Sequence, residues 1–169
     1  ESVNKEYWLS KGMGGSEYCV INLADKFVED GHDVYVTGEV EIETYNKVKY
    51  INYGNLANNQ HFDIVIASNY IHYFKHLEEK NITFNKSYFW IHNLEFYPWY
   101  NGTTIHNNGL DYLNHPKLTN IIAVSEWQKE KLVEKYNLKP EKVKVIGNAI
   151  NPELFDSIEQ EKFKHKVIY

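Results

Sequence analysis

Cysteine is almost absent from this sequence, which has Cys19 alone among 169 residues. A lone cysteine cannot form an internal disulfide, so the fold must depend on its hydrophobic core, and a reducing, cytoplasmic setting is the simpler expectation. The chain also lacks any apolar run near the roughly 18 residues that a membrane-spanning helix requires. We therefore expect neither a disulfide framework nor a transmembrane segment.

A basic cluster is missing as well. The 18 Lys and Arg residues are outnumbered by 23 Asp and Glu residues, which gives a formal net charge of −5, and the basic residues are scattered along the chain. Domains that bind nucleic acid gather positive charge on one face, so we expect no nucleic-acid partner. With 43% hydrophobic residues, the chain has the composition of one globular domain with a sizeable core.

Short apolar segments are the most regular feature that is present. Runs rich in β-branched residues that end in small polar residues are typical of strands buried on both faces of a parallel sheet. Such segments begin at Asp33, Asp63, Ser87, Asn120 and Lys142, whereas the segment from Lys47 alternates more, and we expect it nearer an edge of the sheet.

Helical patterns separate most of these strands. Apolar residues recur at helical spacing over 16–30 and 70–80, and Ser125 with Gln128 forms a capping-box pattern that predicts a third helix ending at Asn137. Alternating strands and helices indicate an α/β domain with a Rossmann-like, doubly wound and mainly parallel sheet.

Ligands of such domains bind at the carboxyl ends of the strands. The predicted ends carry small polar residues and one imidazole, which suits a hydroxyl-rich or phosphate-bearing ligand. These residues are Thr37, Gly38, Ser68, Asn69, His92, Asn93, Ser125, Glu126, Gly147 and Asn148.

The segment GMGGSE, residues 12–17, precedes the first predicted helix. Glycine permits positive φ and close approach to a ligand, and a helix N-terminus favours phosphate. The segment is neither a Walker A loop nor a dinucleotide fingerprint, because the third glycine of the latter would fall at Glu17. The simpler alternative is a tight turn capped by Ser16, with Glu17 as a favourable charge in the first helical turn.

Four segments in order resemble the amino-terminal half of family 4 (group 1) retaining glycosyltransferases with the GT-B fold. They are GMGGSEYCVINLADKFVEDGHDVYV, YFWIHN, IIAVSEWQKEKLVEKY and VIGNAINPELF, which together run from about Gly12 to Phe155. In that family, two Rossmann-like domains face each other across a cleft. The amino-terminal domain holds most of the acceptor site, and the carboxyl-terminal domain binds the nucleotide-sugar.

This resemblance implies a division of the chain. Residues 1–163 would form the acceptor-side domain, and residues 164–169 would begin the link or the first strand of a second, nucleotide-sugar domain. The first strand of the family is not apparent before the glycine segment. We therefore expect a fragment of a longer enzyme of glycan biosynthesis, inactive by itself.

The resemblance also implies roles for particular residues. His92 would be catalytic, beside the transferred sugar, and the backbone at Gly14 and Gly15 would meet the diphosphate or the acceptor. Further substrate-binding residues would be Glu17, Ser125, Glu126 and Asn148. The donor would be a nucleotide-diphosphate sugar and the acceptor a hydroxyl of a glycan, lipid or protein, so contact with a membrane surface is compatible with this interpretation. The family generally needs no bound metal, and we expect no cofactor.

Two constellations have simpler interpretations. Tyr97, Trp99 and Tyr100 could stack on an acceptor, or could anchor their own loop. His72 and His76 have the spacing of a zinc pair, but no third ligand is suggested, so we interpret them as solvated histidines.

Two other functions stay open. One is a non-catalytic module that binds a glycan or a nucleotide on the same scaffold. The other is a different Rossmann-type enzyme, such as a nucleotide-sugar epimerase or dehydrogenase, although the missing third loop glycine speaks against it.

Overall fold

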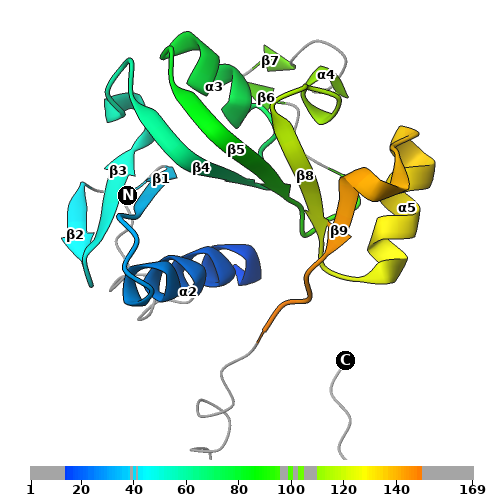
Figure 1. Cartoon of the computed structure of the whole chain (residues 1–169), viewed down its shortest axis with the longest axis horizontal. Helices are drawn as coiled ribbons and strands as arrows, with labels where there is room; N and C mark the ends of the chain where they lie inside the picture. Colours follow the sequence, from blue (N-terminus) through cyan, green and yellow to red (C-terminus); the bar gives the residue numbers. More distant parts are fainter. Residues whose placement is uncertain are drawn as a thin grey trace, which may run out of the picture.

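A four-stranded parallel sheet lies at the centre of this computed structural model (Figure 1). The structure describes residues 14–38, 40, 42–95, 99–100, 103–104 and 110–149. The sheet has the order β4-β5-β8-β9, and its strands are β4 (His61–Ser68), β5 (Thr83–Trp90), β8 (Leu118–Ala123) and β9 (Val143–Val145). All three pairs are parallel, as the continuously apolar segments predict.

Three more strands form a second group beside β4. β1 (Tyr35–Gly38) pairs with β3 (Val48–Asn52) in parallel, and β2 (Glu43–Tyr45) returns antiparallel on the other side of β3. Asn46 and Lys47 both have positive φ in the β2–β3 turn, which is the geometry of a tight hairpin. A third pair, β6 (Trp99–Tyr100) with β7 (Thr103–Thr104), is antiparallel.

The two larger sheets are joined through side chains. The rings of Tyr35 and Phe62 meet edge to face at 5.6 Å, and the Thr37 Oγ1 and Tyr73 hydroxyl oxygens lie 2.5 Å apart. Within the described ranges, no strand is hydrogen-bonded to both β1 and β4. The Rossmann-like α/β character is confirmed, with its strands in two hydrogen-bonded groups.

Helices cover the sheets much as their apolar spacing predicts. α2 (Gly15–Glu29) and α5 (Glu126–Tyr136) agree with the predicted helices to within a residue at each end. The predicted helix over 70–80 is shorter, because α3 (Tyr73–Glu79) follows a turn in which Asn69 has a φ of 59°. The remaining elements are α4 (Leu110–Leu113) and the 3₁₀ turns η1 (Tyr53–Asn55) and η3 (Pro140–Lys142). In the ranges that the structure describes, no helix has the length and apolarity needed to cross a bilayer.

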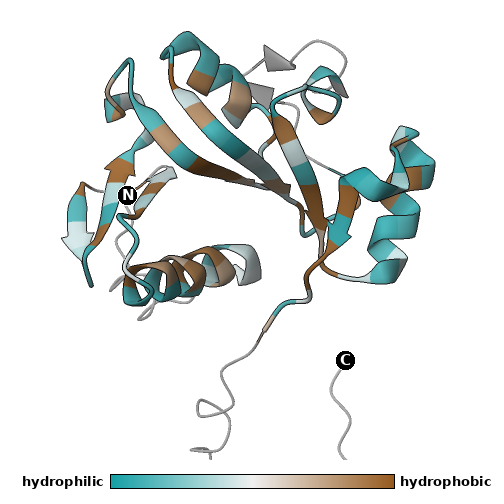
Figure 2. Cartoon of the chain, viewed as in Figure 1, coloured by the Kyte–Doolittle hydropathy of each residue, from teal (hydrophilic) through white to brown (hydrophobic). Residues whose placement is uncertain are grey.

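Two apolar clusters hold these layers together. The larger one joins α3, α4 and α5 to the four-stranded sheet, through residues such as Leu77, Phe89, Leu113 and Leu132. The smaller one joins α2 to the second sheet around Ala24 and Val48. Figure 2 shows the hydrophilic residues over the outer turns of α5, on the side away from the sheet. Each fully buried aliphatic side chain stabilises the fold by about 1.5–3 kcal/mol.

Two predictions about the domain organisation concern the ends of the chain. The expected absence of a first strand falls on residues 1–13, and the predicted boundary between 163 and 164 falls on residues 150–169. Both lie outside the described residues, so both stay predictions.

Gly31 ends α2 in a Schellman motif. Its N–H donates to the Val28 carbonyl at 3.0 Å, and the N–H of His32 donates to the Phe27 carbonyl at 2.9 Å. The rings of Phe27 and His32 pack edge to face at 5.8 Å. This geometry requires a φ of +90° at Gly31, a backbone conformation that residues with a Cβ rarely adopt.

We therefore expect Gly31→Ala to lower the free energy of unfolding by about 1–2 kcal/mol, because alanine would be strained in the left-handed region. Chemical denaturation measures this value. Gly38→Ala is the matched control, because its added Cβ meets only ordinary contact at 3.9 Å and its φ is not positive. Equal stability of the two variants would contradict the motif at Gly31.

Candidate functional site

The carboxyl ends of the parallel strands meet at one edge of the structure. Ser68 at the end of β4 is paired with Trp90 at the end of β5, and Trp90 is paired with Ile122 in β8. Figure 1 shows the amino-terminal end of α2 close to these strand ends. The electrostatics agree with this placement. The negative charge of Glu17, in the first turn of α2, favours a higher pKa at His92, which follows β5. The strand ends and the start of α2 therefore form the candidate site.

His92 is the titratable ring at this edge. It is half-buried, and its imidazole packs against the indole of Trp90 with ring centroids 4.5 Å apart. Its Nε2 atom and the Nε1 atom of Trp90 are buried, and neither has a hydrogen-bond partner among the described residues. Burial lowers the pKa of His92, and the negative charge of Glu17 acts in the opposite direction. A neutral imidazole whose ring nitrogen has no partner is able to form one more hydrogen bond, for which a ligand hydroxyl is suited.

Asn69 holds the backbone at His92 from the end of β4. Its Oδ1 atom accepts a hydrogen bond from the His92 N–H at 2.9 Å, and its own N–H donates to the Trp90 carbonyl at 2.9 Å. Asn69 is buried in the left-handed conformation, which asparagine tolerates better than most residues.

Gln128 holds the same loop from α5. Its Nε2 atom donates to the carbonyls of Ile91 and Asn93, at 3.2 and 3.0 Å, and its Oε1 atom accepts from the Val124 N–H at 2.6 Å. The N–H of Gln128 donates to the Ser125 hydroxyl at 3.1 Å, which confirms the predicted N-cap. The reciprocal bond of a capping box is replaced, because the Gln128 side chain reaches Val124 and the loop after β5.

The start of α2 uses neither a positive φ at Gly14 nor a Ser16 cap. The N-cap is Gly14 with a φ of −65°, so a positive φ is not used there. Ser16 does not cap the helix: its hydroxyl donates to Glu17 at 3.0 Å, and the alternative of a turn capped by Ser16 is therefore wrong. Within the described residues, the first-turn N–H groups of α2 have no side-chain acceptor.

The two glycines differ in the space around them. A Cβ added at Gly14 would collide with the Glu17 carboxylate, whereas no atom of the described residues lies within 4 Å of a Cβ added at Gly15. The described residues therefore leave space at Gly15, and N–H donors at a helix N-terminus favour an anion.

Three other predicted residues are exposed along the same edge. Ser125 and Glu126 follow β8, and Asn148 follows β9. Among the described residues, no hydrogen bond or ion pair joins them to His92, and the Ser125 hydroxyl is already engaged as the cap of α5. Their substrate-binding roles stay predictions.

The predicted acceptor contacts cannot be placed. Tyr97 lies outside the described residues, and Trp99 and Tyr100 are described only as backbone in β6. Their stacking on an acceptor, and the alternative of a self-anchored loop, stay predictions.

The interpretation of His76 as a solvated histidine is wrong. His76 is only 7% exposed, and its Nε2 atom lies 2.9 Å from the Tyr53 carbonyl oxygen. Its ring packs between those of Tyr53 and Tyr73, because the turn before α3 rotates this position toward the core. Across the described ranges, no group of three or more His, Cys, Asp or Glu side chains is arranged to hold a metal ion.

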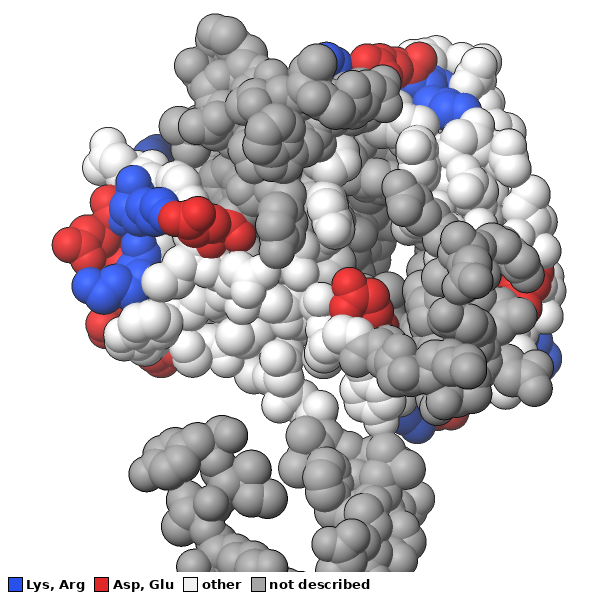
Figure 3. Space-filling model, turned by 180° about the vertical axis from the view of Figure 1, so that it is seen from behind, with Lys and Arg blue, Asp and Glu red and all other residues white. Residues whose placement is uncertain are grey.

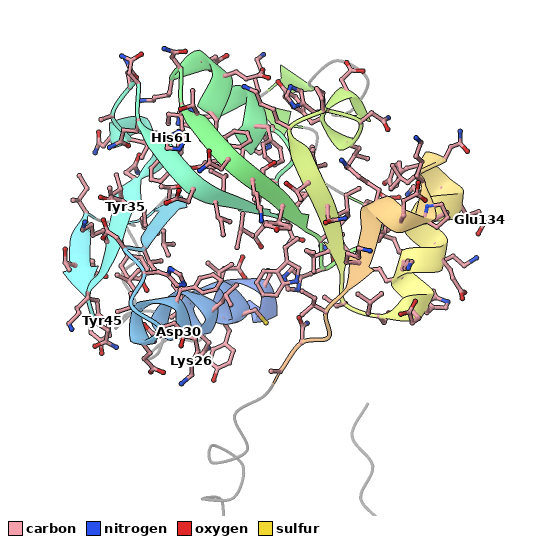
Figure 4. The ribbon with its side chains drawn as sticks, viewed as in Figure 1. Lys26, Asp30, Tyr35, Tyr45, His61 and Glu134 are labelled. Carbon is pink, nitrogen blue, oxygen red and sulfur yellow. The ribbon has the colours of Figure 1, made fainter. Side chains whose placement is uncertain are left out.

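Charged side chains lie mostly in mixed groups away from this edge. Figure 3 shows charged side chains of both signs around the rim of the face opposite to that of Figure 1, and an acidic patch set apart near its middle. Figure 4 shows Lys26, Asp30 and Glu134 pointing outward from α2 and α5. Several charges are paired, as in Lys49–Asp33 at 2.8 Å and Lys135–Glu95 at 2.7 Å.

Sequence patterns placed Asn69 among the residues at the strand ends and Gln128 in a helix cap, but they did not identify either as a partner of the loop after β5. The available signals were an asparagine directly after an apolar strand and a glutamine at the third position of a helix. Neither signal predicts a contact with the loop after β5. Asn69 is separated from its partner in that loop by 23 residues of sequence, and Gln128 from its two partners by 35 and 37.

A model of the family described as Glycosyltransferase Family 4 matches residues 48–154, which is more than half of the chain. The matched range includes Asn69, His92, Gln128 and Asn148. No curated protein and no solved structure matches the chain.

The electrostatic link between Glu17 and His92 can be measured by an NMR titration of the imidazole. We expect the pKa of His92 to lie below the ordinary value of about 6.5, and Glu17→Gln to lower it further, because the removed charge favours the imidazolium. Glu29→Gln, at the other end of α2, is the control and should leave this pKa unchanged. A pKa that stays constant or rises in Glu17→Gln would show that α2 does not begin beside His92.

Proposed function

The chain belongs to glycosyltransferase family 4, and on that premise we propose that it forms the acceptor-side domain of a retaining, GT-B-type enzyme. This enzyme moves a sugar from a nucleotide-diphosphate donor to a hydroxyl acceptor. The observation that carries the proposal is the half-buried imidazole of His92, whose Nε2 atom has no partner among the described residues and which lies beside the start of α2.

The barrier to this reaction comes from charge separation. A positively charged, oxocarbenium-like sugar forms while the negatively charged diphosphate leaves. The first-turn N–H groups of α2, beginning at Gly15, are donors that can face the growing negative charge. A donor that acts as those of an oxyanion hole do would stabilise the transition state by roughly 3–4 kcal/mol.

In this proposal, His92 binds and orients the transferred sugar. Because its pKa is lowered by burial, the ring is neutral at physiological pH and adds no positive charge beside the cationic sugar. Its unpaired Nε2 atom makes a hydrogen bond to a sugar hydroxyl and thereby orients the reacting ring.

The remaining parts of the proposal come from the family. Glu17, Ser125, Glu126 and Asn148 would contact substrates along the edge, and Tyr97, Trp99 and Tyr100 would receive a glycan, lipid or protein acceptor. The nucleotide would be held by a second domain, without a resident metal or cofactor, in a cytoplasmic enzyme that could touch a membrane surface.

The glycine at position 15 offers a direct test. In the protein that carries this chain with the proposed second domain, Gly15→Ala should lower transfer at least about tenfold, because the methyl group keeps a phosphate from the helix N-terminus. The fold should be equally or more stable, because the position is helical and nothing lies within 4 Å of the new Cβ. Nucleoside-diphosphate release and thermal unfolding measure the two effects.

Gly54→Ala is the matched control for that test. Gly54 lies in η1, and its added Cβ meets ordinary contact at 3.4 Å from Asn52 Oδ1. It should retain transfer. Full activity of Gly15→Ala would exclude a close approach of the donor or the acceptor to this backbone.

His92→Ala tests the proposed role of the imidazole. We expect kcat to fall by about 100-fold or more, as for the loss of a well-placed catalytic contact, while the melting temperature changes little. A loss of stability in proportion to the loss of activity would instead make His92 a packing residue. Sugar binding without any turnover in the wild-type protein would support the alternative of a non-catalytic binding module.

A further inference from the structure

We infer that Asn69 and Gln128 are positioning residues, which fix the backbone on both sides of His92 so that its imidazole meets the sugar in one orientation. This inference rests on the proposed function of His92. Neither side chain has to touch a substrate, because both act through the loop that follows β5.

Asn69 fixes the peptide group between Ile91 and His92. Its Oδ1 atom accepts from the His92 N–H at 2.9 Å, and its side chain is only 7% exposed. The Asn69 N–H is itself anchored to the Trp90 carbonyl at 2.9 Å, so both the side chain and the main chain of this residue bind the end of β5. The left-handed turn at Asn69 aims the short side chain back toward the neighbouring strand.

Gln128 fixes the carbonyls on either side of His92. Its Nε2 atom donates to Ile91 and Asn93, the residues directly before and after His92, and the side chain is only 3% exposed. Its Oε1 atom accepts from Val124 at the end of β8, which ties the loop to the next strand. An amide is suited to this place because it supplies two donor hydrogens and an acceptor without a charge.

Together the two amides leave little freedom to the main chain around His92. The Ile91 N–H donates to the Ile122 carbonyl at 3.0 Å, so Ile91 is bonded through both its N–H and its carbonyl. With the bonds at the His92 N–H and the Asn93 carbonyl, four of the six main-chain polar groups of residues 91–93 are hydrogen-bonded. On this held segment, the Nε2 atom of the imidazole has no hydrogen-bond partner among the described residues.

The test is a double-mutant cycle in the protein that carries this chain and the proposed second domain. Asn69→Gly removes the acceptor and keeps the left-handed backbone, which glycine adopts readily. We expect it to lower kcat by about 10- to 100-fold, as small displacements of a catalytic group do, and to leave the donor KM within about twofold. In the His92→Ala background, the same change should leave kcat unaltered, because there is no imidazole to misplace.

The matched control is Asn137→Gly at the carboxyl end of α5. Asn137 is also left-handed, with a φ of 48°, and it is exposed and far along the helix from Ser125. This control should keep wild-type kcat. Gln128→Met, which keeps the length of the side chain and removes its hydrogen bonds, should repeat the dependence on His92 seen with Asn69→Gly.

The outcomes separate the positioning role of Asn69 and Gln128 from the proposed role of His92. If His92→Ala lowers kcat but Asn69→Gly lowers it by the same factor with and without His92, the inference is overturned and the proposed function stands. If His92→Ala leaves kcat unchanged, the role of His92 fails, and the positioning role falls with it. If Asn69→Gly does not fold, Gln128→Met in both backgrounds gives the same decision.

Discussion

The hydrogen bonds from two buried amide side chains to the loop after β5 are the constraint on which this site depends. Asn69 comes from the end of β4 and Gln128 from the first turn of α5, and they reach the same segment from opposite sides. Because Gln128 also binds the end of β8, three parallel strands end in one connected network. Unpaired, these buried polar groups would cost about 1–3 kcal/mol each, so the network favours a single arrangement of the strand ends.

Much of the fold follows from local patterns. The apolar run around Ile64 and the helical spacing in α2 and α5 predict those elements nearly at their bounds, and the run from Ser87 predicts β5, which begins four residues earlier at Thr83. His92 is predictable too, as the imidazole after an apolar strand. The partners of Asn69 and Gln128, and the burial of His76 against Tyr53, depend on contacts between distant segments. No periodicity along the chain encodes those contacts.

The glycines at the start of α2 also show what a sequence pattern predicts and what it leaves open. Their spacing indicates a backbone close to a ligand, and the open space at Gly15 agrees with that expectation. The pattern cannot tell which glycine is needed for conformation and which for space. At Gly14 an ordinary φ is accompanied by the nearby carboxylate of Glu17, whereas the left-handed glycine of this helix is Gly31 at its other end. Among the described residues, the site thus combines a helix start without a side-chain cap and an imidazole whose pKa is lowered by burial, and the proposed release of an anion beside a cationic sugar rests on these two features.

Hydrogen exchange at the His92 amide tests the central claim most directly. This N–H lies in a loop, but its acceptor is the buried Oδ1 atom of Asn69. The account predicts that it exchanges as slowly as the Ile91 amide, which is bonded to β8, and that the two open together with the sheet. Rapid exchange at His92 beside a protected Ile91 would show that the loop is not held, and it would contradict the account.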